Sequence, residues 1–419
     1  MSKLQELINK LCPNGVEFKP LGDISNLSRG KVYGKDYISE HRGEYPVFSS
    51  QTVNDGELGK IDTYDYDGFY LTWTTDGAYA GTIFYRQGKF SITNVCGLIS
   101  LKVNFINLKF LYYWLSIEAP KHVYYGMGNP KLMSNQMTSI MIPVPPIEVQ
   151  EEIVRILDSF SDYAAELQAE LQARKQQYEY YRNLLLTFNP SAYGCGTDDE
   201  QKDGVTTWEG HNYKIQWKKM GEICKSINTG LNPRKFFKLN TPDANGYYVT
   251  IREIRNGRII FSEKTDRINN AALKLCNNRS NIESGDVLFS GTGTIGQVAV
   301  VHESPSIWNI KEGVYAIKPI TCIISPFFLR YLLESKNIKD SIMKRVAGGT
   351  VQSISMAELK NIVIPIPPLE LQEKIVAILD RFETLVNDLT NGLPAEIAAV
   401  KDQYEYYRNK LLTFKKLSA

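Results

Sequence analysis

Long apolar runs and closely spaced cysteines are both missing from this chain of 419 residues. No stretch of about 18 consecutive apolar residues occurs, and the opening segment MSKLQELINKLC mixes charged with apolar residues. Neither a membrane span nor a secretory signal is therefore expected. The six cysteines lie far apart, and even the closest pair, Cys195 and Cys224, cannot form a CxxC or zinc-knuckle pattern. A soluble protein of the reducing cytoplasm is predicted.

The sequence also lacks the patterns that indicate catalysis. GTGTIG at residues 291–296 has the letters of a dinucleotide-binding loop, but strand-like segments flank it on both sides, whereas that loop must open a helix. A glycine-rich turn between two strands is predicted instead. No GxxxxGK[ST] loop or HExxH pair occurs, the four histidines are scattered, and neither Asn-Pro dipeptide continues as the NPPY-like loop of an amino-methyltransferase. We expect no catalytic residue, no metal site and no cofactor bound by this chain.

A chain of this length is expected to form roughly two to four domains, and its charge is divided unevenly along the sequence. The formal net charge is only +2, but residues 205–367 hold 22 Lys and Arg against 13 Asp and Glu, a net charge of +9. Residues 13–145 are balanced at 12 against 12, and residues 146–188 carry 4 against 8. Solvated surface lysines alone could supply half of the excess, but the basic segment is compatible with a polyanionic partner.

An internal repeat organises the sequence. The segment IPVPPIEVQEEIVRILDSF at residues 142–160 returns as IPIPPLELQEKIVAILDRF at residues 364–382. Further on, QYEYYRNLLLTF at residues 177–188 returns as QYEYYRNKLLTF at residues 403–414. The offset grows from 222 to 226 residues, so the second copy holds four extra residues. The chain therefore consists of a variable block, a repeat, a second variable block and a second repeat.

Each repeat is predicted to be a long helix with a heptad seam, because apolar and aromatic residues recur at alternating spacings of four and three. Pro145-Pro146 marks the start of the first helix and Asn189-Pro190 its end, which gives about 43 residues and about 64 Å. The second copy contains Asn391-Gly392-Leu393-Pro394, which should break or kink its helix. The residues expected to make coiled-coil or subunit contacts are Ile153, Leu157, Phe160, Leu167, Leu171, Tyr178, Tyr181, Ile375, Leu379, Phe382, Tyr404 and Tyr407.

Two seams of matching period in one chain are expected to pack on each other as an antiparallel coiled coil. This pairing relates the two variable blocks by an approximate two-fold axis, whereas a parallel pairing would leave both blocks at the same end. The alternative is that each helix packs on its own globular block, and seam aromatics such as Tyr181 are compatible with either arrangement.

Both variable blocks are predicted to be α+β globules. Short β-type runs are broken by Gly, Asn and Asp, and helices are expected near residues 110–117 and 326–334. The acidic, turn-rich segment at residues 189–204 is typical of an exposed linker. The expected strands are Phe69–Trp73, Gly97–Val103, Val249–Ile251, Val287–Ser290 and Val298–Val301.

Basic, aromatic and amide side chains gather on the turns of both blocks. Arginine can read guanine through two hydrogen bonds, amide and hydroxyl groups read other base edges, and lysine holds phosphates. Each residue alone is more often a solvated surface group, but the set as a whole favours nucleic acid. The residues expected to contact DNA are Arg29, Lys31, Tyr33, Lys35, Ser50, Gln51, Thr75, Lys131, Arg234, Lys235, Arg252, Arg255, Arg258, Thr292, Lys344, Arg345 and Gln352.

In its duplicated order of blocks, the chain resembles the specificity subunit of type I restriction–modification systems along essentially its whole length. The IP(V/I)PP(I/L)E(V/L)QE(E/K)IV segment before each helix and the QYEYYRN…LLTF segment at each helix end carry the resemblance. It implies a non-catalytic DNA-binding scaffold in which each globule reads one half of a bipartite site and the paired helices set the distance between the halves. It also implies two methyltransferase subunits docked on the helices, which would use S-adenosylmethionine, with restriction subunits outside them.

The resemblance also suggests domain boundaries. They are residues 1–145 for a first target-recognition domain with a short N-terminal helix, 146–188 for the first helical region, 189–205 for a linker, 206–367 for a second target-recognition domain and 368–419 for the second helical region. A stand-alone DNA methyltransferase would need the motifs found absent above. The remaining alternative is a structural coiled-coil adaptor, or a DNA-binding regulator without a restriction–modification role. An adaptor would need neither two large loop-rich globules nor the uneven charge.

Overall fold

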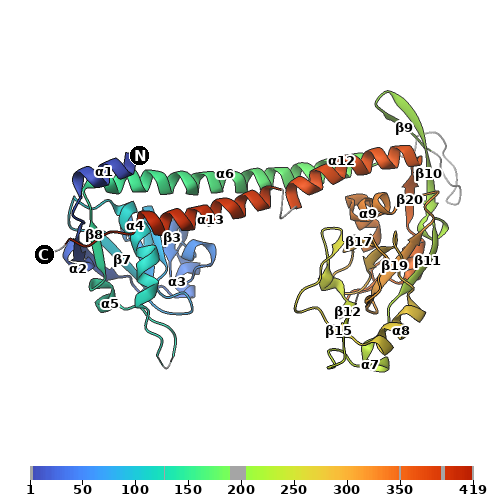
Figure 1. The fold of residues 1–419 in the computed structure, drawn as a ribbon, viewed down its shortest axis with the longest axis horizontal. Helices are drawn as coiled ribbons and strands as arrows, with labels where there is room; N and C mark the ends of the chain where they lie inside the picture. The colour runs from blue at the N-terminus through green and yellow to red at the C-terminus, as the bar shows by residue number, and fades with distance from the viewer. Residues whose placement is uncertain (1–2, 127, 189–203, 349–350, 388–391, 418–419) are drawn as a thin grey trace. The chain divides into compact units, whose positions relative to one another are not determined.

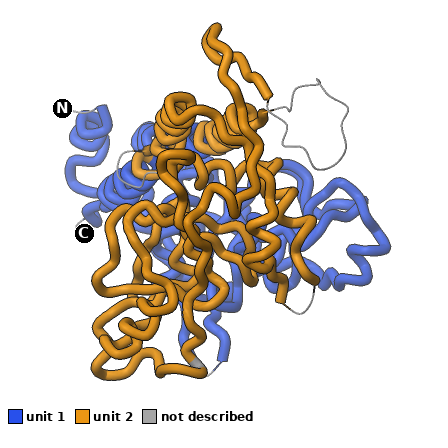
Figure 2. Tube along the Cα trace, turned by 90° about the vertical axis from the view of Figure 1, so that its right-hand side faces the viewer, with its two compact units in different colours: residues 1–168, 397–419 blue, residues 169–396 orange. Residues whose placement is uncertain are grey.

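The structure, a computed structural model, describes residues 3–126, 128–188, 204–348, 351–387 and 392–417. The chain divides into two units, of which unit 1 contains residues 1–168 and 397–419 and unit 2 contains residues 169–396 (Figure 2). Each unit combines one globular part with segments of both helical regions. The mixture of helices and strands confirms the α+β class predicted for the variable blocks (Figure 1).

The first helical region is one helix, α6 (Ile147–Leu185), of 39 residues. It begins directly after the proline pair, and Val149 N and Gln150 N both donate to the carbonyl of Pro146, which closes the first turn. The helix ends three residues before the predicted end at Phe188, because Leu186 and Phe188 leave the helix and are buried in the core of unit 2.

The second helical region is divided into two helices, as the Asn-Gly-Leu-Pro sequence predicts. Helix α12 is described over Leu369–Asn387, and helix α13 (Leu393–Leu411) begins after Gly392. Proline fits the first turn of α13, where its missing N–H costs nothing.

The helices pair in the antiparallel direction. In unit 1 the ring of Phe160 stacks on Tyr407 with centroids 5.5 Å apart, and in unit 2 Tyr181 stacks on Phe382 at 5.5 Å. From Phe160 to Tyr181 the residue numbers rise along α6, while those of the stacked partners fall from Tyr407 to Phe382. This order confirms the antiparallel coiled coil. The alternative is also partly right, because Ile153 of the seam is buried in one cluster with residues of the globular part of unit 1.

Unit 1 is built on a sheet with the strand order β2-β7-β5-β6-β3-β4, and β1 pairs separately with β8. The expected N-terminal helix, the helix near residue 110 and the strand at Phe69–Trp73 are all present, while β7 ends two residues before the expected Val103. The elements are α1 (Lys3–Leu11), β1 (Glu17–Pro20), α2 (Leu21–Ile24), β2 (Ser25–Arg29), α3 (Lys35–Glu40), β3 (Arg42–Phe48), η1 (Val53–Gly56), β4 (Glu57–Ile61), β5 (Tyr66–Thr74), β6 (Ile83–Ile92), β7 (Cys96–Leu101), α4 (Leu108–Glu118), η2 (Ala119–His122), α5 (Ser134–Thr138) and β8 (Met141–Val144).

Unit 2 contains a sheet of order β11-β19-β16-β17, a sheet of order β20-β10-β9, a sheet of order β15-β12-β18 and the β13-β14 hairpin. The elements are β9 (Gly204–Trp208), β10 (His211–Lys219), η3 (Met220–Glu222), β11 (Cys224–Thr229), α7 (Pro233–Phe236), β12 (Gly246–Val249), η4 (Ile251–Glu253), β13 (Ile254–Arg255), β14 (Arg258–Ile259), β15 (Arg267–Ile268), α8 (Asn270–Arg279), β16 (Val287–Ser290), β17 (Val298–Val300), β18 (Trp308–Ile310), β19 (Val314–Pro319), α9 (Pro326–Glu334), α10 (Lys336–Met343), α11 (Met356–Lys360) and β20 (Val363–Ile366).

Two expectations for unit 2 need correction. The strand predicted at Val249–Ile251 ends at Val249, because Thr250 caps a short 3-10 helix by accepting a hydrogen bond from Arg252 N. The last two linker residues, Gly204 and Val205, belong to strand β9, and residues 189–203 of the linker lie outside the described residues. The glycine-rich turn between strands β16 and β17 is confirmed.

The two units repeat one topology. The order β2-β7-β5-β6 in unit 1 matches β11-β19-β16-β17 in unit 2. A glycine follows the first strand of each set, and a Cβ on Gly30 or Gly230 would lie 1.9 Å from the carbonyl oxygen of Ile92 or Ile310. Only glycine fits such a close backbone approach.

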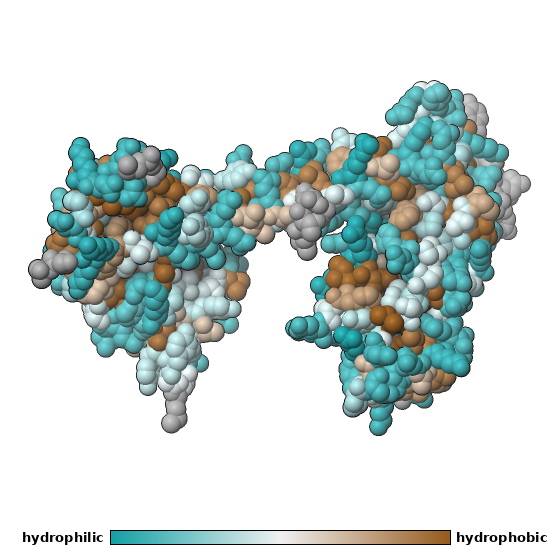
Figure 3. All heavy atoms as spheres, viewed as in Figure 1, coloured by the Kyte–Doolittle hydropathy of each residue, from teal (hydrophilic) through white to brown (hydrophobic). Residues whose placement is uncertain are grey.

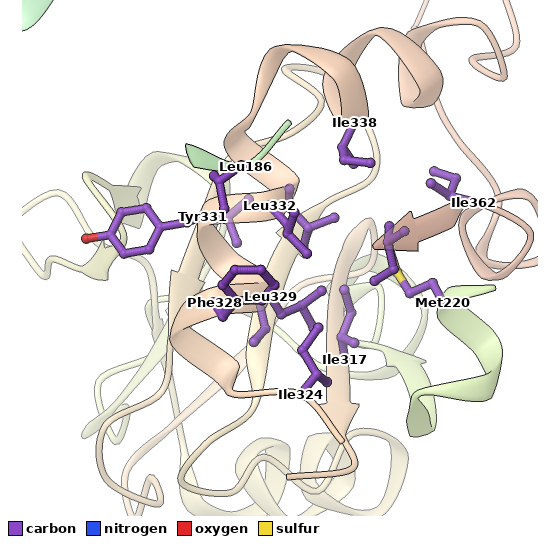
Figure 4. Packing of buried hydrophobic residues seen from close by; sticks show 14 of the residues in the cluster. Leu186, Met220, Ile317, Ile324, Phe328, Leu329, Tyr331, Leu332, Ile338 and Ile362 are labelled. Carbon is purple, nitrogen blue, oxygen red and sulfur yellow. The ribbon is translucent and has the colours of Figure 1, made fainter. Parts of the chain in front are cut away.

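Helix α9 carries much of the core of unit 2. Its residues Phe328, Leu329 and Leu332 point into the cluster formed with Ile317 of β19 and Met220 (Figure 4). Leu186, which directly follows α6, lies in the same cluster, so the end of the first repeat is packed into the second globular part.

Candidate nucleic-acid interface

Two loops far apart in the sequence pair with each other at the end of strand β5 in unit 1. Gly77 N donates to the carbonyl of Pro130 at 3.1 Å, and Leu132 N donates to the carbonyl of Thr75 at 2.9 Å. The second loop belongs to residues 123–126 and 128–132, which we call the unit 1 hairpin. The backbone bonds fix the loop and the hairpin as one surface.

Unit 2 repeats this arrangement at the end of strand β16. Gly293 N donates to the carbonyl of Gln352 at 2.9 Å, and Ile354 N donates to the carbonyl of Gly291 at 2.9 Å. We call residues 346–348 and 351–354 the unit 2 hairpin. Thr292 and Gln352 were both predicted to contact DNA, but nothing in the sequence indicated that they lie near each other. The backbone pairing brings them together, and both are exposed.

The core supports both hairpins in the same way. In unit 1 the indole Nε1 of Trp73 donates to the carbonyl of Leu132 at 3.0 Å. In unit 2 the hydroxyl of Tyr315 donates to the carbonyl of Ile354 at 2.6 Å. A large buried aromatic residue therefore holds the base of each hairpin.

The unit 1 hairpin displays aromatic side chains that the sequence reading missed. Tyr124 and Tyr125 are 66% and 75% exposed, and Tyr79 beside the paired loop is 66% exposed. Tyr124 closes the hairpin against Lys131, whose exposed side chain adds a positive charge. Pale and teal residues cover this end of unit 1 in the space-filling view, as expected for a surface that meets water or a polar partner (Figure 3). The signal in the sequence was the Tyr-Tyr pair followed by glycines.

Several predicted residues of unit 1 converge on the turn before β7. The hydroxyls of Ser50 and Thr75 both donate to the carbonyl of Val95. Arg29 lies on β2 opposite Gly97, and its guanidinium approaches the sulfur of Met133 at 3.2 Å, next to the unit 1 hairpin. The fold thus gathers basic and hydroxyl residues from three segments of the chain.

Thr75 is a correction to the predicted set. Its side chain is only 2% exposed, and its hydroxyl is bound to Val95, so it builds the loop and does not offer a group to DNA. Ser50 is half-buried and bound to the same carbonyl. Gln51 is exposed, but its amide donates to the carbonyl of Glu57.

A second group in unit 1 surrounds Asp65. Lys31 forms an ion pair with this carboxylate, and the hydroxyl of Tyr33 donates to it at 2.6 Å. Burial opposes the charge of Asp65, but the hydrogen bonds from Lys31 and Tyr33 outweigh it, so the pKa of Asp65 is lowered. Lys35 lies apart from this group and lines a pocket of about 420 Å³ together with Arg42 and Lys60.

In unit 2, Arg252 and Thr292 line one pocket of about 380 Å³. The guanidinium of Arg252 is paired with Asp266 at 2.7 Å and remains half exposed. Lys311 lines the same pocket and is exposed. The two predicted residues therefore share one concave surface that also touches the unit 2 hairpin through Thr292.

The other predicted basic residues of unit 2 lie on short strands, a short helix and the segment after α10. Arg255 and Arg258 lie on strands β13 and β14, and both side chains point away from the core. Lys344 and Arg345 follow α10 and lead into the unit 2 hairpin. Lys235 is exposed on α7, which also contains Arg234.

A buried glutamine joins each globular part to its helix. Gln150 Oε1 accepts from Asn107 N at 2.8 Å, and its Nε2 donates to the carbonyls of Phe105 and Pro145, both at 2.8 Å. Gln372 repeats all three bonds: it accepts from Ser325 N and donates to the carbonyls of Ile323 and Pro367. Both glutamines belong to the repeated PP(I/L)E(V/L)Q motif. These three hydrogen bonds give a structural reason for a glutamine at this position in both copies.

A tyrosine–aspartate pair adds to each joint. The hydroxyl of Tyr113 on α4 donates to Asp158 on α6 at 2.6 Å. The hydroxyl of Tyr331 on α9 donates to Asp380 on α12 at 2.5 Å. Lys109 also binds Asp158, at 2.7 Å.

The predicted seam residues divide by burial. Ile153, Leu157, Leu167, Tyr178, Ile375 and Leu379 are buried, while Phe160, Leu171, Tyr181, Phe382 and Tyr404 are half-buried. Tyr407 stacks on Phe160, but 40% of its surface is exposed. A fully buried seam predicts a smaller exposed fraction. The repeated tyrosines with the most exposed rings are Tyr180 and Tyr406, which the seam did not include.

Within the described ranges, no group of three or more His, Cys, Asp or Glu side chains is arranged to hold a metal ion. None of the helices described is long and apolar enough to cross a membrane.

A family described as "Type I restriction modification DNA specificity domain" matches residues 13–174 and, a second time, residues 213–399. A putative type I specificity subunit of Mycoplasma pneumoniae is 32% identical over 390 residues, which cover 93% of this chain and 95% of that protein. A second one from the same organism is 31% identical over 374 residues, covering 85% of this chain and 97% of that protein.

Solved structures show the same fold. The crystal structure of the S subunit of a type I restriction-modification system from M. genitalium covers 96% of this chain and 97% of its own, with a TM-score of 0.52 and 16% identity. A chain from a study of complex assembly and conformational transition of the type I R-M system covers 96% of this chain and 98% of its own, with a TM-score of 0.57 and 17% identity. The adaptor and regulator alternatives are not favoured. This chain belongs to the family of type I restriction–modification DNA specificity subunits, which are non-catalytic.

Proposed function

We propose that this subunit binds double-stranded DNA at a bipartite sequence, and that each globular part reads one half of it. The observation that carries this proposal is the repeated pairing of a loop with a hairpin, Gly77 with Pro130 in unit 1 and Gly293 with Gln352 in unit 2. Two copies of one surface with different side chains are what two different half-sites require. The target-recognition domains are residues 1–145 and 206–367, and the linker at residues 189–205 connects the first helical region to the second domain.

The side chains around these surfaces suit the grooves and backbone of DNA. In unit 1 they are Arg29, Lys131 and the exposed tyrosines of the unit 1 hairpin. In unit 2 they are basic and amide groups: Lys344 and Arg345 stand before the unit 2 hairpin, and Gln352 stands on it. Amide and guanidinium groups read base edges, whereas lysine positions the phosphates. Thr75 is left out of this set because it is buried.

The helical regions, residues 146–188 and 368–419, would hold the other subunits. Tyr180 and Tyr406 occupy equivalent positions of the repeat and expose 63% and 60% of their surface, which suits a protein interface. Two equivalent sites favour two methyltransferase subunits, with restriction subunits joining outside them. S-adenosylmethionine would be used by the methyltransferase subunits, and this chain would bind no cofactor. The free thiols of the described cysteines suit action in the reducing cytoplasm.

Selection of bound duplexes from a random library tests the division into half-sites. Tyr125→Ala combined with Lys131→Ala should relax the base preference in one half and leave the other half unchanged. Gln352→Ala should do the reverse, and Lys10→Ala on α1 serves as the control. Relaxation of both halves by either variant, or of neither half by both, would contradict the proposal.

Salt dependence tests which residues touch phosphates. Each neutralised phosphate contributes about −0.9 to the slope of log affinity against log salt. Lys344→Ala with Arg345→Ala should therefore flatten the slope by about 1.8 if both residues bind the backbone. An unchanged slope would remove both from the interface.

A further inference from the structure

Arg330 of α9 is a buried cation that joins α9 to α12. Its side chain is 5% exposed, and both terminal nitrogens bind the carboxylate of Glu383 on α12, with Nη1 to Oε2 at 2.6 Å. Nη2 also lies 3.3 Å from Glu334. Burial opposes the charge, but the hydrogen bonds to Glu383 and the two carboxylate charges outweigh it and raise the pKa of Arg330. The guanidinium is therefore fixed in place and charged.

The β13-β14 hairpin rests directly on this guanidinium. Gly257 at its turn has a φ of +70°, and a Cβ built there would lie 2.2 Å from Cζ of Arg330. Glycine is thus required both by the backbone angle and by the contact. On its other side, the carbonyl of Gly257 accepts from Val300 N at 3.1 Å, which attaches the hairpin to β17.

The same hairpin carries two of the exposed arginines assigned above to DNA. Arg255 precedes and Arg258 follows the Asn256-Gly257 turn, and neither forms an ion pair with a carboxylate described in the structure. The Nε of Arg255 donates to the carbonyl of Arg252 at 2.9 Å, which directs its side chain along the surface. A single buried residue therefore lies between helix α12 and this basic turn.

The residues that make this contact are not repeated in unit 1. The segment FLYYWL on α4 corresponds to FLRYLL on α9, and Tyr112 stands at the position of Arg330. Ser161 stands at the position of Glu383 in the repeat. The contact belongs to the more basic of the two globular parts, where residues 205–367 carry a net charge of +9.

We propose that Arg330 is a positioning residue for DNA binding: anchored to α12 by Glu383, it holds the Arg255–Arg258 turn in the orientation that meets the DNA backbone. This inference rests on the proposed function, since it assumes that the turn faces DNA. In this arrangement the position of helix α12 directly affects the DNA contact made by the turn. A change in α12 at Glu383 would move the turn without any change in the residues that touch DNA.

A double-mutant cycle on the full-length chain tests the inference, with salt dependence of binding to a target duplex as the readout. Arg255→Ala with Arg258→Ala should flatten the slope of log affinity against log salt by about 1.8, for two lost phosphate contacts. Arg330→Met should produce a comparable flattening in the wild-type background and none in the Arg255→Ala/Arg258→Ala background. Lys109→Met, which alters the joint of unit 1, should leave the slope unchanged.

Two further variants keep the test valid if Arg330→Met does not fold. Gly257→Ala displaces the turn from the hairpin side, and Glu383→Gln weakens the anchor from the helix side. Both should flatten the slope, and neither should add to the effect of Arg255→Ala/Arg258→Ala.

The outcomes separate the two proposals. Additive effects of Arg330→Met and the arginine pair would overturn the positioning role while leaving the turn as a DNA contact. No effect of Arg255→Ala/Arg258→Ala on the slope would remove the turn from the interface and overturn the positioning role, while the bipartite binding proposed above would stand or fall with the selection from the random library. Wild-type slopes for Arg330→Met, Gly257→Ala and Glu383→Gln would overturn the positioning role alone.

Discussion

The joint between globular part and helix is formed by the same two devices in both units, but its surroundings differ. Each joint has a buried glutamine with three backbone hydrogen bonds and a tyrosine–aspartate pair. In unit 1 the aspartate also binds Lys109, whose side chain is partly exposed. In unit 2 the neighbouring charges are Arg330, Glu334 and Glu383, which are largely buried.

This difference shows which part of a joint has to be repeated. The glutamine bonds only to backbone atoms, so it works whatever side chains the neighbouring loop carries. The charged residues bond to side chains that differ between the units, so each globular part supplies its own set. The repeated device should therefore give equal effects in the two units, and the unrepeated charges unequal ones.

The largest effect is expected at the unrepeated charge. Arg330→Met leaves two buried carboxylates without a partner and should lower the free energy of unfolding by about 3–5 kcal/mol. Lys109→Met in unit 1 removes a partly exposed pair and should cost about 1 kcal/mol or less. Urea denaturation of both variants measures the difference. Equal losses would mean that the two joints depend on charge to the same degree.

Loss of the repeated glutamine should give equal effects. Gln150→Leu and Gln372→Leu each remove the partner of one N–H and two carbonyl groups that are buried or partly buried, at a cost of about 3 kcal/mol. The same denaturation experiment checks both variants, and Gln168→Leu on the exposed face of α6 is the control. A difference of more than about 1.5 kcal/mol between the two joints would break the equivalence, because it exceeds the spread expected for matched hydrogen bonds.

The stacked tyrosines of the coiled coil should give smaller losses. Tyr181 is half-buried against Phe382, so Tyr181→Ala should cost about 2 kcal/mol, less than a fully buried aromatic residue. Tyr407 is more exposed against Phe160, and Tyr407→Ala should cost about 1 kcal/mol. Thermal unfolding ranks the two variants, and a larger loss for Tyr407 would show that its ring is covered in solution.

The smallest and most specific difference is in acid sensitivity. Arg155 and Lys3 hydrogen bond the Glu152 carboxylate on α6 and lower its pKa to about 2, whereas the equivalent position in unit 2 is Lys374. A lowered pKa stabilises the fold above the ordinary Glu range, and this contribution is lost as the pH falls toward 2. Glu152→Gln should therefore destabilise the chain at pH 7 and cease to do so near pH 2. Denaturation midpoints measured across this range test it, and a penalty independent of pH would contradict it.

The helical half of the fold could be predicted from sequence because its signals are local. Heptad spacing, the proline pair and the Asn-Gly-Leu-Pro break each act within a few residues, and all three appear in the structure. The end of α6 was placed three residues too late because Leu186 and Phe188 are drawn into the core of unit 2, which no local pattern records. Ile153 likewise belongs to the seam and to a globular core at once.

The candidate site was predictable in composition but not in arrangement. Turn residues with basic side chains are exposed as expected, including Arg258 and Lys344. The prediction for Thr75 was wrong because its hydroxyl donates to the carbonyl of Val95, which is 20 residues away in the sequence. The pairing of each loop with its hairpin joins residues more than 50 positions apart, and the repeat in the sequence does not extend to these segments. Only the fold shows that the two surfaces are equivalent.

The strands that open and close each variable block lie next to each other, and this has an evolutionary consequence. Glu17 pairs with Val144 across β1 and β8, and Gln216 pairs with Ile366 across β10 and β20. The first and last strands of each block are thus paired with each other by backbone hydrogen bonds, which do not depend on the side chains within the block. Recombination that exchanges the genetic segment between these strands would transplant a complete DNA-reading module and conserve its attachment. New target sequences could then arise in a single step of gene exchange.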